Sequence, residues 1–184
     1  MRIRAFLAVP AAALVAAIAL CFTANSARGD GVGEPEVGAA APAFSLNDNT
    51  GKAVQVGGAA TTSWTVLAFY PKAMTGGCTK EVCSLRDAHK DLEGLDAKVY
   101  AISIDDVQAC AEFVKKESLN FQLLSDPDRS VVAKYGAVME GMSFAARTTF
   151  VIDPKGVLRH VDRSVKVMSH GADLVAVLKR LKSG

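Results

Sequence analysis

Residues 64–70 form a continuous apolar run that ends at Pro71. A run of this length without a charged residue is typical of a strand that is buried on both faces of a sheet. Residues 98–104, which begin with Lys98, and residues 148–152 form two further short, mainly apolar runs that we expect to be strands. An Asp-Pro-Lys-Gly turn signal follows the third run, so we expect residues 157–161 to return as its hairpin partner.

Helical patterns lie between and after these strands. Apolar residues at positions 107, 110, 111 and 114 have the spacing of one helix face, and positions 174, 177, 178 and 181 repeat it near the C-terminus. Strands that alternate with helices predict an α/β fold, with a central mixed β-sheet flanked by α-helices. A length of 184 residues allows one domain of ordinary size and a short extension.

Composition and charge exclude several classes of protein. The chain is 50% hydrophobic and 22% charged, which fits a globular domain rather than a disordered chain. A net charge of +2 is too small to indicate a nucleic-acid partner. The three histidines are scattered, and no cysteine pair has the two-residue spacing of a zinc knuckle or a thioredoxin-type dithiol. We therefore expect neither a metal nor another cofactor.

Residues 1–26 have the features of a signal peptide. Two arginines precede an apolar, alanine-rich run over residues 5–22, and Ala24 and Ser26 are small residues at the two positions that a signal peptidase inspects. We therefore expect an exported protein, located in a bacterial periplasm. The alternative is that residues 5–22 are not removed and anchor the protein in a membrane. Apart from such an anchor, we expect no membrane contact.

The rest of the chain divides into a lead-in and a domain. Residues 27–40 are rich in Gly, Ala and Glu without periodicity, which predicts a flexible lead-in to a domain over residues 41–184. Near the start of that domain, the Asn-Thr-Gly sequence at residues 49–51 predicts a hairpin turn.

The residues that could take part in a chemical reaction follow the first predicted strand. A glycine-containing loop leads from Pro71 into a helical pattern that starts near Cys78. At a helix N-terminus the unpaired backbone N–H groups and the positive end of the dipole favour a thiolate, which is the nucleophilic form of cysteine. Thr75 lies three residues earlier, and its hydroxyl can hydrogen-bond the sulfur or an incoming oxygen.

Cys83 follows Cys78 by five residues, and this spacing limits how the two can interact. Five residues of helix rise ~7.5 Å, whereas a disulfide requires Cα atoms closer than about 7 Å. A bond between these cysteines therefore cannot coexist with an intact first helical turn. The pair would act as a switch, helical when reduced and locally unwound when oxidised. The alternative is that the two cysteines merely pack or stay permanently bridged.

Removal of residues 1–26 would leave a third cysteine, Cys110, beside this pair. Cys110 shares an apolar helix face with Val107 and Val114, which predicts a buried, inert thiol. The alternative is a second resolving residue or an intermolecular partner. We expect His89 and His170 to be surface or packing residues rather than acid–base groups.

Pro71, Thr75 and Cys78 match the signature of the peroxiredoxins, which is proline, three residues, threonine or serine, two residues and cysteine. The segment therefore resembles that family, and the second cysteine five residues later resembles its bacterioferritin-comigratory-protein (PrxQ) subfamily. Further matching segments extend the resemblance from residue 41 to residue 153. The resemblance implies a thioredoxin-like fold, in agreement with the α/β pattern.

The resemblance implies a role for each matching residue. Cys78 would be the peroxidatic cysteine, which attacks a hydroperoxide and becomes a sulfenic acid. Cys83 would be the resolving cysteine, which condenses with that sulfenic acid to form a disulfide. Thr75 and the Cys78 backbone N–H would hold the peroxide oxygens. Arg147 would favour the thiolate and stabilise charge on the leaving oxygen, and Glu81 would orient Arg147.

The function implied by the resemblance is that of a thiol peroxidase. It would reduce hydrogen peroxide and organic hydroperoxides without a cofactor, and an external dithiol reductant such as thioredoxin would recycle it. The five-residue spacing permits a monomer, because both cysteines belong to one chain. Two other functions stay open: a peroxide-driven thiol oxidase that passes its disulfide to exported client proteins, and a non-catalytic binding module on a thioredoxin-like scaffold.

The chain departs from the subfamily at Gly76, where proline is usual. Because glycine has more backbone freedom to lose on folding, we expect Gly76 and Gly77 to loosen the loop before Cys78. A looser loop would lower the reactivity toward peroxide modestly.

Overall fold

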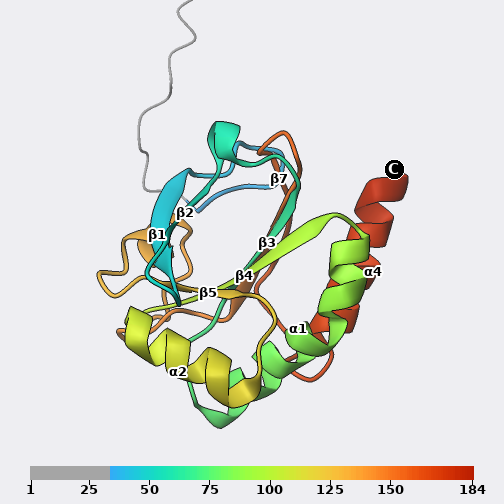
Figure 1. Cartoon of the computed structure of the whole chain (residues 1–184). Coiled ribbons are helices and arrows are strands. Elements are labelled where there is room, and N and C mark those ends of the chain that lie inside the picture. Colours follow the sequence, from blue (N-terminus) through green and yellow to red (C-terminus); the bar gives the residue numbers. More distant parts are fainter. Residues whose placement is uncertain (1–33) are drawn as a thin grey trace, which may run out of the picture. The chain divides into compact units, whose positions relative to one another are not determined.

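The computed structural model describes residues 34–184. The predicted signal peptide, the alternative membrane anchor and the first part of the lead-in lie outside the described residues. The described chain forms a seven-stranded sheet in the order β2-β1-β5-β4-β3-β6-β7 (Figure 1). The strands are β1 (Phe44–Asp48), β2 (Ala53–Val56), β3 (Trp64–Phe69), β4 (Ala97–Ser103), β5 (Gln122–Ser125), β6 (Thr148–Ile152) and β7 (Leu158–Asp162). The helices are α1 (Gly76–Gly94), α2 (Val107–Glu117), α3 (Ser130–Lys134) and α4 (His170–Ser183), with a short 3-10 turn η1 (Gly58–Ala60).

The sheet is mixed, as predicted, with β3 near its centre. β3 pairs in parallel with β4 and antiparallel with β6, while β5 continues the parallel part beside β4. β7 adds antiparallel to β6, and the hairpin of β1 and β2 adds antiparallel to β5. The continuous apolar run of the first predicted strand is explained by this central place, because β3 is covered on both faces.

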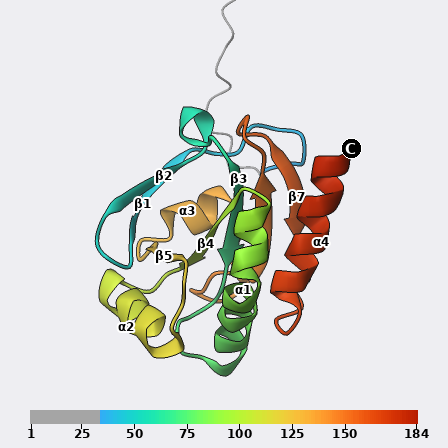
Figure 2. The same ribbon diagram turned by 45° about the vertical axis from the view of Figure 1, so that its right-hand side comes forward.

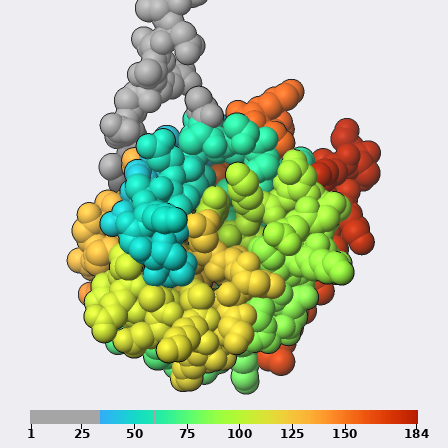
Figure 3. Space-filling view, viewed as in Figure 1, coloured from blue at the N-terminus to red at the C-terminus, as the bar shows by residue number. Residues whose placement is uncertain are grey.

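Side chains of β3 divide between two apolar cores, one on each face of the sheet. Val66 and Ala68 point into the core that α1, α2 and α4 cover, whereas Leu67 and Phe69 point into the core that α3 covers. Figure 2 shows α1 and α4 side by side on their face, with α3 behind the sheet. The hairpin of β1 and β2 (cyan) and α2 (yellow) lie next to each other on the surface in Figure 3.

The predicted strands and helices are confirmed, with boundaries that move by a few residues. β6 matches the predicted strand over residues 148–152, and β7 starts and ends one residue later than expected. The hairpin turn at residues 49–51 is also present, since Asp48 Oδ1 accepts hydrogen bonds from the backbone N–H groups of Thr50 and Lys52.

The end of the predicted lead-in is held more firmly than we expected. Gly38 N–H donates to Leu158 O, Leu158 N–H donates to Ala39 O, and Ala40 forms an isolated bridge with Val157. Residues 38–40 therefore run antiparallel beside the start of β7, so the paired part of the chain begins before residue 41. Within residues 34–184, none of the helices combines the length and the apolar character needed to cross a bilayer.

Candidate active site

Cys78 lies in the first turn of α1, just beyond the end of β3. Tyr70 N–H donates to Ile102 O, and Pro71, which has no N–H, ends this pairing. The loop that follows leads to Thr75, the N-cap of α1, so Cys78 is the third helical residue. Cys78 is only 1% exposed, and its backbone N–H belongs to the helix-terminal set that has no partner within the helix. The sequence-predicted position of this thiol is confirmed.

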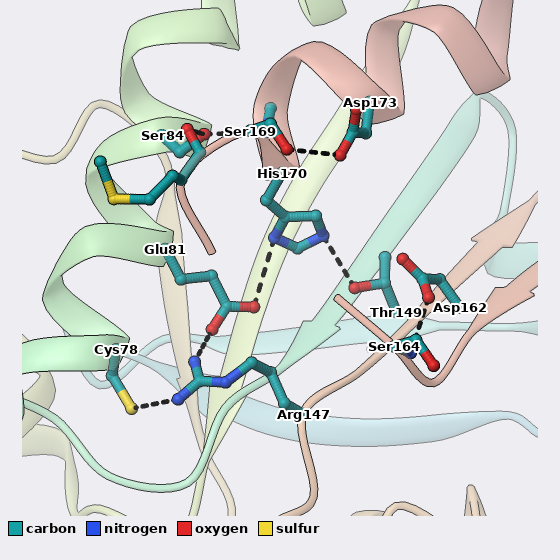
Figure 4. Close-up of polar contacts among 12 residues, drawn as sticks. Cys78, Glu81, Ser84, Arg147, Thr149, Asp162, Ser164, Ser169, His170 and Asp173 are labelled. Carbon is teal, nitrogen blue, oxygen red and sulfur yellow. Dashed lines mark hydrogen bonds and ion pairs between the residues drawn. The ribbon is translucent and has the colours of Figure 1, made fainter. Parts of the chain in front are cut away.

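Arg147 reaches the Cys78 sulfur from a position just before a neighbouring strand. It directly precedes β6, and the antiparallel pairing of Phe69 with Thr148 brings the start of β6 beside the end of β3. The guanidinium Nη2 lies 3.4 Å from Cys78 Sγ, and Nη1 pairs with Glu81 Oε2 (Figure 4). The structure therefore joins the three predicted residues Cys78, Glu81 and Arg147 in one chain of polar contacts.

Glu81 and Cys78 stabilise the positive charge of Arg147. Burial by itself would lower the pKa of Arg147, but the Glu81 carboxylate and the Cys78 sulfur together raise the pKa above its ordinary value. Gly77 allows the guanidinium to approach, because a Cβ atom there would lie 3.3 Å from Arg147 Nη2. A fixed positive charge thus faces the sulfur at the N-terminus of a helix.

Glu81 is itself held from its other side by His170, the first residue of α4. Glu81 is 1% exposed and His170 is 2% exposed, and Glu81 Oε1 lies 3.2 Å from His170 Nδ1. The second ring nitrogen, Nε2, lies 2.9 Å from the Thr149 hydroxyl (Figure 4). Of our two expectations for His170, packing is right and a surface position is wrong. Sequence reasoning missed the His170 and Thr149 contacts, because nothing local in the sequence links residue 170 to residue 81.

Thr75 stands at the start of α1, and its side chain is exposed. Its hydroxyl donates to Lys72 O at 3.1 Å, and its backbone carbonyl accepts from Thr79 N–H. A hydroxyl has one proton, so this donation leaves its oxygen lone pairs to accept a hydrogen bond from a ligand. In this conformation Thr75 is ready to accept rather than to donate.

Cys83 lies on the same helix as Cys78, so the predicted helical arrangement of the pair is present. Both thiols are free. Cys83 is half-buried, and its Sγ lies 3.8 Å from Glu117 Oε2 on α2. Burial raises the pKa of Cys83, Arg86 lowers it, and Glu117 raises it further, so the net pKa is above the ordinary value for a thiol.

Cys110 is buried in the core on the α1 side of the sheet, as predicted. Burial, with a smaller contribution from Asp105, raises the pKa of Cys110 to about 12. This thiol is therefore protonated at neutral pH and shielded from solvent. Within residues 34–184, no group of three or more His, Cys, Asp or Glu side chains is arranged to hold a metal ion.

Comparison with known proteins agrees with this arrangement. The chain belongs to the AhpC/TSA family, whose model matches residues 37–161. Peroxiredoxin Bcp of Escherichia coli is 37% identical over 146 residues, which cover 73% of this chain and 90% of that protein. The crystal structure of peroxidoxin BcpB from Mycobacterium tuberculosis is 32% identical, with a TM-score of 0.72 over 80% of this chain and 99% of that one.

A further structural relative is the bacterioferritin comigratory protein of Xanthomonas campestris, which is 28% identical with a TM-score of 0.69 over 75% of this chain and 91% of that one. The fold is therefore the thioredoxin-like fold of the peroxiredoxins, as predicted. Within its family the chain groups with the Bcp and PrxQ peroxiredoxins, so its activity is that of a thiol peroxidase with a peroxide substrate and a thiol reductant. These relatives support neither the thiol oxidase nor the binding module.

Proposed function

We propose that Cys78 is the peroxidatic cysteine of this thiol peroxidase and that Cys83 is its resolving cysteine. The observation that carries the proposal is the position of Cys78 Sγ, which is buried at the N-terminus of α1 and lies 3.4 Å from the Arg147 guanidinium. Both the arginine charge and the helix terminus favour a negatively charged sulfur. By contrast, Cys83 lies beyond the first turn of α1 beside the Glu117 carboxylate and Cys110 is buried in the core, and the pKa of each of these two thiols is raised.

In the first step the Cys78 thiolate attacks the terminal oxygen of a hydroperoxide. The new S–O bond forms as the O–O bond breaks, so the sulfur is oxidised to a sulfenic acid while the peroxide is reduced to water or an alcohol. Thr75 accepts a hydrogen bond from the O–H group of the peroxide, since its own proton is donated to Lys72 O. Arg147 stabilises the negative charge that develops on the leaving oxygen, which then takes up a proton from solvent.

In the second step Cys83 condenses with the sulfenic acid. Its sulfur attacks Cys78 Sγ, the S–O bond breaks, and water leaves with the thiol proton, which gives an intramolecular disulfide. Since the two residues are separated by more than a turn of α1, the helix must unwind locally between them before they can bond. An external dithiol, thioredoxin or a protein like it, then reduces the disulfide by exchange.

We propose hydrogen peroxide and organic hydroperoxides as substrates and a monomer as the working unit. The reacting group is the O–O–H terminus that both substrates share. A single chain carries Cys78 and Cys83 on one helix, so no second subunit is needed to complete the reaction cycle.

Two serine variants test these assignments. Cys78→Ser should abolish peroxide consumption, because no other thiol among residues 34–184 contacts Arg147. Cys83→Ser should keep the first turnover but stop at the sulfenic acid, which a dimedone probe followed by mass spectrometry would detect at Cys78. Unchanged peroxidase activity in Cys78→Ser would refute the peroxidatic assignment, and steady turnover with thioredoxin in Cys83→Ser would refute the resolving assignment.

We also propose that residues 1–26 are a cleaved signal peptide, that residues 27–40 lead into the catalytic domain at residue 41, and that the enzyme works in a bacterial periplasm. The support is the sequence pattern of the first 26 residues. Expression of the full chain in a Gram-negative host, followed by fractionation and mass measurement, should give a periplasmic protein that begins at residue 27. A full-length protein in the membrane fraction would instead show the anchor over residues 5–22.

A further inference from the structure

We propose that His170 is a positioning residue for the peroxidase reaction, which holds Glu81 and through it keeps Arg147 over Cys78. The inference rests on the proposed function, because it assumes that Cys78 reacts with peroxide beside Arg147. His170 touches neither the sulfur nor the substrate position. It acts at the far end of the contact chain that runs from Cys78 through Arg147 and Glu81 to α4 (Figure 4).

Two buried polar atoms, one on Glu81 and one on His170, face each other. Glu81 Oε2 is used by Arg147, whereas Glu81 Oε1 and His170 Nδ1 have no well-aligned hydrogen-bond partner among residues 34–184. These two atoms lie 3.2 Å from each other. A carboxylate only accepts, so a favourable contact between these two atoms requires a ring proton on Nδ1. Removal of Nδ1 would leave a carboxylate oxygen buried without any polar neighbour, which is a costly state that the side chain would avoid by moving.

The backbone of α4 is fixed against α1 where this contact is made. Gly171 N–H donates to Ser84 Oγ at 3.0 Å, and Ser84 lies one turn after Glu81 on α1. A Cβ atom at Gly171 would overlap Ser84 O and would lie 2.6 Å from Ala88 Cβ, so only glycine permits this approach. His170 is therefore presented to Glu81 by a close helix contact, not by a flexible loop.

The contact with His170 limits the movement of Glu81 and Arg147, and this affects the reaction. Glu81 has several rotatable bonds, and a contact with Arg147 alone would let both side chains move together. The second contact, with His170, fixes the carboxylate plane and with it the direction of the guanidinium. Because stabilisation of the leaving oxygen requires donors in a preorganised position, a displacement of Arg147 by about 1 Å can lower the rate by about 100-fold.

His89 provides a matched comparison within the same molecule. It also pairs its Nδ1 with a glutamate, Glu93 Oε2 at 3.5 Å, and it is also buried, with its ring stacked on Phe121. Glu93 is largely exposed and lies one turn after His89 on α1. This pair is near the C-terminal end of the helix, whereas Cys78 is in its first turn. Substitutions at His89 therefore affect the stability of α1 but leave the contact chain from Cys78 to His170 intact.

Two substitutions separate the ring nitrogens of His170. The amide nitrogen of asparagine takes the position of Nδ1, whereas that of glutamine takes the position of Nε2. We expect His170→Asn to keep the rate constant of the reduced protein with hydrogen peroxide within about threefold, and His170→Gln to lower it about 10- to 100-fold. Alkylation of Cys78 by iodoacetamide, which has no peroxide oxygen to stabilise, should fall less than the peroxide rate in His170→Gln.

Thermal unfolding of each variant and the pair His89→Asn and His89→Gln are the controls. The His89 variants should leave the peroxide rate unchanged. Equal rates in His170→Asn and His170→Gln, or an equal fall in the alkylation and peroxide rates, would overturn the positioning role and leave the proposed function intact. Failure of the unaltered protein to oxidise Cys78 would overturn both. If His170→Gln does not fold, Thr149→Val offers a second test, because it spares Nδ1 and should keep the peroxide rate.

Discussion

The two cysteines of α1 have opposite electrostatic surroundings. Cys78 faces the positive Arg147 guanidinium, whereas Cys83 lies beside the negative Glu117 carboxylate. Burial and Glu117 raise the pKa of Cys83 more than Arg86 lowers it, so in the helical state this residue is a protonated thiol and a weak nucleophile. This difference supports the proposal that Cys78 makes the first attack and that Cys83 reacts only after α1 unwinds.

The influence of Glu117 can be measured directly. In a Cys78→Ser background, Glu117→Gln removes the negative charge near Cys83 and should lower the pKa of that thiol. A lower pKa gives more thiolate at a given pH, so alkylation of Cys83 by iodoacetamide should become faster at pH 8 and its midpoint should move to lower pH. Glu112→Gln, an exposed change on the same helix, is the control and should leave the alkylation rate unchanged. A slower or unchanged rate in Glu117→Gln would contradict this account.

At the residue scale, sequence was sufficient for side chains that belong to a compact motif or match a family position. Cys78 could be placed at a helix terminus from the strand, the glycine loop and the helical pattern around it. Arg147 and Glu81 came from the resemblance, and the structure joins them to Cys78. His170 could not be found in this way, because its contact with Glu81 depends on how α4 packs against α1.

The first turn of α1 is the element that must be ordered for peroxide and disordered for resolution. Gly76 is its first residue, where proline is favourable, and the preceding Thr75 has the extended backbone that proline requires. A Cβ atom at Gly76 would meet no neighbouring atom within 4 Å. The looser loop that we expected from the sequence can therefore be tightened without a clash.

Gly76→Pro should stabilise the helical state of this turn by about 0.4–1 kcal/mol. The rate constant with hydrogen peroxide should rise about two- to fivefold, because that free energy is no longer lost on ordering the loop. Disulfide formation should slow, so excess peroxide should leave more Cys78 as sulfinic acid, which mass spectrometry can quantify. A peroxide rate that is unchanged or lower would show that the glycine does not limit the first step.

The contact between α1 and α4 is the second element-scale feature. Gly171→Ala would force its new Cβ into Ser84 O and should cost about 1–3 kcal/mol of stability by overpacking. The melting temperature should fall, and the peroxide rate should fall with it as His170 moves from Glu81. Gly94→Ala is the matched control, because a Cβ atom at Gly94 on α1 meets open space. Equal behaviour of the two variants would mean that the close approach has no functional role.

How well a helix or strand could be predicted depended on its length and on how clear its apolar pattern was. β3 and β6 are continuous apolar runs and α2 has a clear helical period; the two strands were predicted within one residue and α2 within three. We made no prediction for β5 or α3, because β5 is a four-residue strand and the five residues of α3 are little more than one helical turn, too short to show a helical period. Their positions are fixed by tertiary pairing and packing, through the parallel register with β4 and the core on the second sheet face.

At the scale of the whole molecule, the sheet order assembles the site from distant parts of the chain. The central pairing of β3 with β6 brings Arg147 to Cys78, and the packing of α4 on α1 brings His170 to Glu81. Glu81 lies between the two cysteines, so unwinding of α1 for disulfide formation must break its contacts with Arg147 and His170. In the proposed cycle, oxidation therefore dismantles the peroxide site, and reduction of the disulfide restores it.

The central claim is that peroxide links Cys78 to Cys83, and one measurement tests it directly. The fully reduced protein is mixed with one equivalent of hydrogen peroxide, quenched with an alkylating agent, and analysed by intact mass and peptide mapping. We predict a rapid loss of two hydrogens, a disulfide between the Cys78 and Cys83 peptides, and an unmodified Cys110 thiol. A protein in which Cys78 is still a free thiol after this treatment would contradict the account.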